Sequence, residues 1–273
     1  MSWFTDRHCF ALAVVIYGVA MMHSFFLWRQ GFRRHDFINY GILFLGFLFH
    51  TTAMLKRGFS LERCPIHNLF EATMFIDWTI VTVYLVLGVV PRLRHLGAFA
   101  TPLIVSLGVF ALMPDLDGAG LEPQFGHWWT SLHAALSLLA YGAFGLSAVA
   151  ALMYLTQDHD LKFQKFRAVF SLLPSIQRLE GLAVRLVFCG VVLLGMGLLV
   201  GFAGVKQQYG VYYKSDPKIH WSLLVWMFYL GILVAKGWYA QRGRRFAWGS
   251  IGGFIFVLLT FWGFNLFSTI HHP

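Results

Sequence analysis

The chain has 273 residues, of which 58% are hydrophobic and only 12% are charged. A soluble domain usually carries about 25% charged residues, so this composition excludes an ordinary soluble protein. The formal net charge of +9 needs no nucleic-acid partner, because a basic cytoplasmic face gives a membrane protein the same excess.

Apolar residues come in unbroken blocks along the whole chain. A helix needs roughly 20 mainly apolar residues to cross a bilayer core. Eight stretches meet this length or come close to it: 9–28, 37–55, 69–90, 96–113, 128–155, 182–204, 220–239 and 247–269. They are apolar on all faces, as lipid-embedded helices are. We therefore predict an all-α, polytopic membrane protein with about eight transmembrane helices, forming a single domain over residues 1–273.

Lysine and arginine residues predict the orientation of these helices, because they concentrate in cytoplasmic connections. Fourteen of the 21 lie in or beside the first, third, fifth and seventh connections. The fourth connection, 114–127, has no lysine or arginine and carries Asp115, Asp117 and Glu122. Both termini are therefore predicted on the outer, periplasmic side.

Histidines collect on the predicted outer side of the membrane. The chain has 12 histidines, and most of them lie near the outer ends of different stretches. A neutral imidazole is a good ligand for haem iron, zinc or copper, although interfacial residues are also often polar. In the segment 127–133, Trp129 and His133 are four residues apart and share one helix face. An aromatic surface beside a ligating nitrogen favours a flat macrocycle over a bare metal ion.

Ionisable groups inside the apolar stretches are costly and suggest function. Glu71 and Asp77 lie six residues apart in the third stretch, and His23 lies inside the first. Each of them has a structural alternative, a satisfied hydrogen bond between helices. Cys189, in the sixth stretch, is expected to be a small buried apolar residue.

Five segments resemble the cytochrome c assembly family, of the CcsA/ResC type and its smaller HemX/YpjD-like relatives. They cover most of the chain, and their order and predicted placement match the family. The segments are His50–Arg57, Cys64–Ala72 (Cys-Pro-Ile-His-Asn-Leu-Phe-Glu-Ala), Trp129–Ser137, Tyr209–Trp221 with its Asp-Pro-Lys-Ile-His-Trp ending, and Asn265-Leu266 followed by His271 and His272.

The resemblance implies a protein of the bacterial inner (cytoplasmic) membrane that presents haem b at the outer face for attachment to apocytochrome c. His133 and either His271 or His272 would hold the iron, and the loop 207–221 would hold the haem edge. A ResB/CcsB-type membrane partner is implied as well, and the chain would be a subunit of a haem lyase without a nucleophile of its own. The implied haem-binding residues are His133, His271, His272, Trp129, Tyr212, Tyr213, Asp216, Trp221, His67, His50, Asn68 and Glu71.

Two departures from the family pattern leave an alternative open. The loop reads Tyr-Gly-Val-Tyr-Tyr-Lys-Ser before Asp216, where the family has tryptophans, and Val234 stands where the core synthases have a histidine. The alternative is a membrane regulator or scaffold, of haem biosynthesis or of a partner complex, that does not ligate haem itself.

Overall fold

The computed structural model describes residues 5–30, 36–61, 68–117, 128–162, 174–211, 213, 217–238 and 243–267. All regular structure in these residues is helical. The helices are α1 (Asp6–Gln30), α2 (Asp36–Leu61), α3 (Leu69–Gly88), α4 (Leu96–Ala111), α5 (Trp128–Lys162), α6 (Ile176–Tyr209), α7 (Pro217–Trp238) and α8 (Gly243–Phe267), with short 3-10 turns η1 (Pro91–Leu93) and η2 (Pro114–Asp117) on either side of α4. The predicted all-α polytopic architecture is confirmed.

Six helices of the described part of the chain are long and apolar enough to cross a membrane: α1, α2, α3, α5, α6 and α7. The fourth predicted span corresponds to α4, an apolar helix of 16 residues with Pro102 inside it. Its length is below the roughly 20 residues that a straight crossing needs. The eighth corresponds to α8, which is 25 residues long and begins with Gly-Arg-Arg.

Local sequence signals define several helix ends. The side chain of Asn68 caps α3 by accepting a hydrogen bond from the Glu71 amide at 2.8 Å. Gly210 ends α6 in the left-handed conformation, with φ of 73°, and donates its amide to the Lys206 carbonyl. Pro217 begins α7, where its missing amide hydrogen has no cost.

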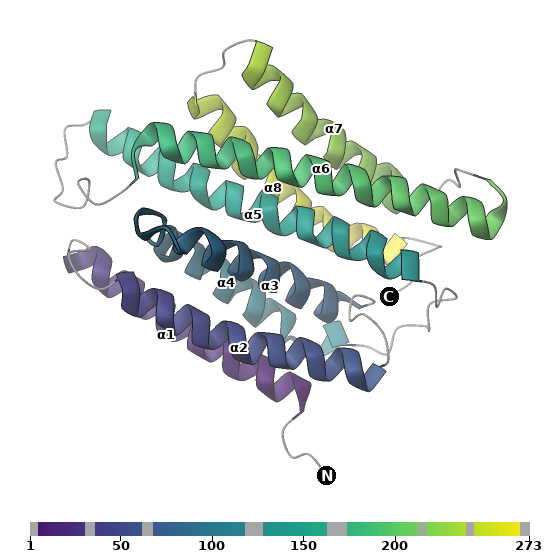
Figure 1. Cartoon of the computed structure of the whole chain (residues 1–273), viewed down its shortest axis with the longest axis horizontal. Helices are drawn as coiled ribbons and strands as arrows, with labels where there is room; N and C mark the ends of the chain where they lie inside the picture. Colours follow the sequence, from purple (N-terminus) through teal and green to yellow (C-terminus); the bar gives the residue numbers. More distant parts are fainter. Residues whose placement is uncertain are drawn as a thin grey trace.

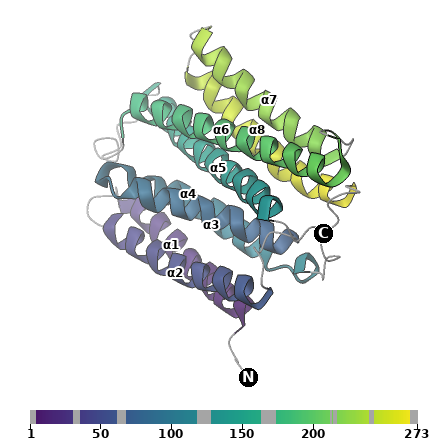
Figure 2. The same ribbon diagram turned by 45° about the vertical axis from the view of Figure 1, so that its right-hand side comes forward.

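The helices form two groups that meet along α5 (Figure 1). Helices α1 to α4 make one group and α5 to α8 the other, and the second view shows the same division (Figure 2). Helix α5 contacts α3, α4, α6 and α8, so it occupies the centre of the molecule. Its residues 140–151 are all buried, and eight of these twelve are glycine, alanine or serine, which allow close helix packing in a membrane.

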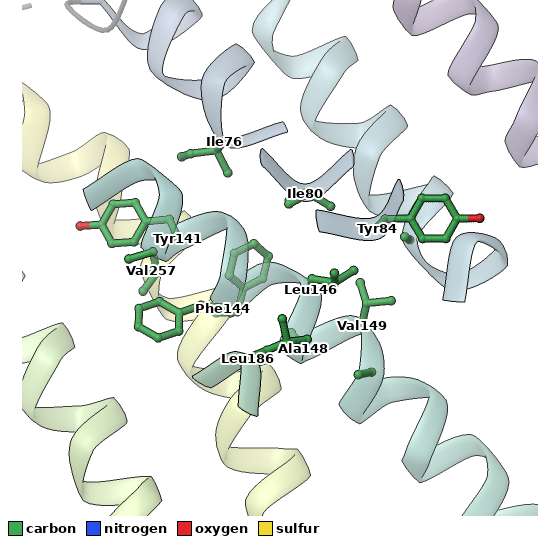
Figure 3. Close-up of a cluster of buried hydrophobic side chains, with 14 of the residues drawn as sticks. Ile76, Ile80, Tyr84, Tyr141, Phe144, Leu146, Ala148, Val149, Leu186 and Val257 are labelled. Atoms are coloured by element: carbon green, nitrogen blue, oxygen red, sulfur yellow. The ribbon is translucent and has the colours of Figure 1, made fainter. Parts of the chain in front are cut away.

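The buried core connects the two groups through aromatic and branched side chains (Figure 3). Phe144 of α5 stacks on Tyr229 of α7 with ring centroids 3.7 Å apart. Gly190 of α6 makes room for Phe144, because a Cβ atom there would lie 2.3 Å from Phe144 Cε1. Ile76 and Ile80 of α3 extend the same cluster into the first group.

Successive helices run in opposite directions, so alternate connections share one end of the bundle (Figure 1). We call the end at which α3, α5 and α7 begin the outer end, after the predicted topology. It also holds the beginning of α1 and the ends of α2, α4, α6 and α8 (Figures 1 and 2). The side of the membrane that this end faces stays a prediction.

Candidate functional site

A groove at the outer end lies between the beginnings of α5 and α7 and the end of α6. Trp129 and His133 of α5 line it, together with Gly201 and Gly204 of α6 and Ile219 of α7. The groove has a volume of about 70 Å³ and mainly apolar walls. Small-molecule sites commonly have about 300–1,000 Å³, so the groove itself encloses only a small part of a large ligand.

The His133 ring is held in one orientation at the wall of this groove. Its Nδ1 lies 2.7 Å from the carbonyl oxygen of Gly197 on α6. A carbonyl only accepts, so Nδ1 carries the hydrogen and the lone pair of the neutral ring is on Nε2. Ligating histidines are usually fixed in this way, by a hydrogen bond from the other ring nitrogen.

Two glycines of α6 create the space that Trp129 and His133 occupy. A Cβ atom on Gly201 would lie 2.8 Å from His133 Nδ1, and one on Gly204 would lie 2.9 Å from Trp129 Cδ1. Real Cβ atoms essentially never come so close to another heavy atom. Sequence reasoning missed these positions, although the spacing of Gly197, Gly201 and Gly204 on one helix was a usable signal.

The predicted haem-edge loop is only partly described. The Tyr213 hydroxyl is hydrogen-bonded to His220 Nε2, and the two rings meet edge-on with centroids 5.8 Å apart. Trp221 is buried and packs against Phe256 of α8, with ring centroids 4.7 Å apart. Tyr212 and Asp216 lie outside the described residues.

Asn68 and Glu71 belong to a separate polar cluster at the outer end of α1, α2 and α3. Arg57 of α2 is its centre, with Nε 2.8 Å from Glu71 Oε1, Nη1 3.0 Å from Asp6 Oδ2 and Nη2 2.5 Å from Asp117 Oδ1. Asn68 also donates to Asp117, at 3.2 Å. The Asn-Leu-Phe-Glu segment thus joins three helices and η2. Arg57 was missed as its partner, because the sequence shows only a basic residue near a span end.

His50 is buried in the first helix group rather than beside His133. Its Nε2 lies 3.1 Å from the Met74 carbonyl and its Nδ1 lies 3.2 Å from the Tyr17 hydroxyl. Both ring nitrogens therefore have partners in the protein. His67 lies outside the described residues.

The C-terminal histidines also lie outside the described residues, but the helix before them does not. Helix α8 ends at Phe267, four residues before His271. Its end lies at the outer end of the bundle (Figures 1 and 2). The pairing of His133 with His271 or His272 stays a prediction.

Comparisons with known proteins point to one family. The family model described as "Cytochrome C assembly protein" matches residues 66–272, which run from the start of α3 to beyond α8. The chain is 26% identical to "Cytochrome c biogenesis protein CcsA" of Guillardia theta, over 84% of this chain and 82% of that protein. It is 27% identical to "Protein HemX" of Brevibacillus brevis, over 97% of each.

Proposed function

Because this chain belongs to the cytochrome c assembly protein family, we propose that it takes part in cytochrome c maturation by holding haem b in the outer groove. The haem would be its substrate, presented there to apocytochrome c. The observation that carries the proposal is the orientation of His133. Its ring lines a groove with mainly apolar walls, and the Gly197 carbonyl accepts from Nδ1, so that Nε2 would be the ligating nitrogen.

The residues around the groove would have different roles in binding haem, according to their side-chain chemistry. His133 Nε2 would bind the iron on one face, and His271 or His272 would reach the other face from the end of α8. Trp129 would offer an aromatic surface for the porphyrin. Tyr213 and His220 lie close to the beginning of α7. The protein would contribute binding and orientation, and the bond-forming thiols would come from apocytochrome c.

The proposed setting of this activity is the one that the family resemblance implies. The outer end would face the periplasm and the helices would span a bacterial inner membrane. A ResB/CcsB-type protein is the proposed membrane partner. In this arrangement the groove would open toward the compartment in which the substrate thiols are offered.

A second candidate function is regulation or scaffolding without haem ligation. The tyrosine-rich loop before α7 favours it, because it lacks the tryptophans of the family pattern. The two candidates differ in whether haem binds through His133.

The test is the absorption spectrum of the protein purified in detergent. Wild type should retain haem with a low-spin spectrum after washing. His133→Gly should lose the haem or the low-spin bands, and added imidazole should restore them because it can take the place of the missing ring. His159→Gly, at the opposite end of α5, is the control and should change nothing.

Truncation after Ile270 tests the second ligand. It removes His271 and His272 together, so neither can substitute for the other, and it should have the same imidazole-sensitive effect as His133→Gly. An unchanged haem spectrum in His133→Gly would reject ligation by His133. A wild-type protein that holds no haem would favour the regulatory function.

A further inference from the structure

Asp77 is a carboxyl group buried in the first helix group, away from the outer groove. It lies on α3, a candidate membrane span, and its side chain is fully buried. Neither carboxyl oxygen has a hydrogen-bond partner among the residues that the structure describes. Glu71, six residues earlier on the same helix, is equally buried but is paired with Arg57. The two acids of α3 therefore differ in how their charge is compensated.

The neighbours of Asp77 that the structure describes do not supply a positive charge. Tyr17 of α1 lies close enough to interact electrostatically with Asp77. Its hydroxyl meets His50 Nδ1 at 3.2 Å, while His50 Nε2 meets the Met74 carbonyl at 3.1 Å. A neutral His50 satisfies both contacts, with its N–H directed to Met74 and its lone pair to Tyr17. The single N–H of His50 is thus donated to the Met74 carbonyl, and a neutral His50 brings no positive charge to Asp77.

Within the described ranges, the other helices packed against α3 add no cation at this depth. Helix α4 has no titratable side chain, and at the middle of α5 the titratable group is Tyr141, which interacts with Ser222 of α7. The guanidinium of Arg57 is shared by three carboxylates at the outer end. An ionised Asp77 would therefore be a charge in a low-dielectric interior without compensation.

Burying such a carboxylate costs far more than burying the neutral acid, and the group avoids the cost by keeping a proton. We propose that Asp77 is a proton-binding site of the folded protein, protonated at neutral pH and enclosed by α1, α2 and α3. Proton binding forms one O–H bond on the carboxylate and breaks one O–H bond of a hydronium ion, which leaves as water. The ligand is a proton rather than a metal cation.

This site links proton uptake to the packing of α1 and α2. The family match begins at residue 66, so Tyr17, which interacts with Asp77, and its partner His50 both lie outside the matched region. Gly46 of α2 allows the approach, since a Cβ atom there would lie 2.4 Å from Tyr17 Cε1. Separation of α1 and α2 from α3 would let water reach the carboxyl, which would then release its proton.

Infrared spectroscopy of the purified protein tests the proposal without any assay of haem. The wild type should show the carbonyl stretch of a protonated carboxylic acid at neutral pH, shifted in protein labelled with ¹³C-aspartate. Asp77→Asn should lose that band, and Glu71→Gln should keep it. The isotope experiment uses the native chain, so it holds even if a variant folds poorly.

Two results would overturn the proposal. One is the absence of a ¹³C-sensitive acid band at neutral pH, which would show that Asp77 is ionised. The other is loss of the band on adding sodium chloride at constant pH, which would show that a cation takes the site.

Stability gives an independent readout. Above about pH 4, where an aspartate in the unfolded chain ionises, the folded protein would bind one proton more than the unfolded chain. Wild type should therefore lose thermal stability as pH rises from about 4 through neutral pH. Asp77→Asn is neutral at every pH and should lack this component of the decline. Identical pH dependence in wild type and Asp77→Asn would contradict the proposed proton binding.

Discussion

Arg57 connects three acidic residues at the outer end of the first helix group, so its loss should destabilise the protein more than the loss of any one acid. Arg57 is close to Glu71, Asp6 and Asp117 at distances between 2.5 and 3.0 Å. Its side chain is 15% exposed and that of Glu71 is 0% exposed. We consider the replacements Arg57→Leu and Glu71→Leu.

The expected magnitudes differ because the two replacements leave different groups unpaired. Arg57→Leu leaves the buried carboxylate of Glu71 without its ion-pair partner, which typically costs about 3–5 kcal/mol. Glu71→Leu leaves Arg57 with Asp6 and Asp117, so the loss is close to that of one hydrogen bond to a charged group, about 1.5–3 kcal/mol. The double replacement should be more stable than Arg57→Leu alone, because it removes the buried unpaired acid.

Thermal unfolding in one detergent, followed by helical circular dichroism, measures the difference. With roughly 2–4 °C per kcal/mol for a chain of comparable size, Arg57→Leu should lower the melting temperature by on the order of 10 °C and Glu71→Leu by about half as much. Arg185→Leu is the control, since Arg185 is exposed on α6. A smaller effect for Arg57→Leu than for Glu71→Leu would refute the central role of Arg57. A double variant less stable than Arg57→Leu would refute the account of the unpaired acid.

Two further predictions concern the groove and the orientation of the chain. Gly201→Ala would place a methyl group against His133 and should weaken haem retention by about 10–100-fold, as loss of a ligand's supporting contacts does. Gly181→Ala is the control, because nothing lies within 4 Å of its Cβ position. This variant should retain haem normally in the same absorption measurement. A reporter active only in the cytoplasm should be active when fused after residue 243 and silent when fused at residue 119, and the reverse pattern would invert the predicted topology.

Hydropathy alone placed the helices along the chain. The stretch 69–90 corresponds to α3 (Leu69–Gly88), and the stretch 220–239 closely matches α7 (Pro217–Trp238). This agreement has a physical basis, because a segment in lipid must be apolar on its surface and must satisfy its backbone hydrogen bonds internally. The same reasoning underestimated α6, predicted as 182–204 but observed as Ile176–Tyr209. Hydropathy marks the part of a helix inside the membrane and does not show where the helix itself ends.

The partners of the polar side chains depended on the tertiary structure. Glu71 and Asp77 looked alike in sequence, yet one meets Arg57 and the other has no hydrogen-bond partner among the described residues. His50 and His133 were assigned to one haem site, but the structure buries His50 between α1 and α3 and places His133 at the groove.

Cys189 shows the same limit of sequence reasoning, because it was expected to be buried and is exposed on α6. The sequence of a membrane helix is apolar all round, so it carries little information about its rotation. The rotation of each helix about its axis decides which side chains meet. That rotation is set by close packing at small residues such as Gly190 and Gly201. These contacts exist only between assembled helices, so the sequence alone does not show them.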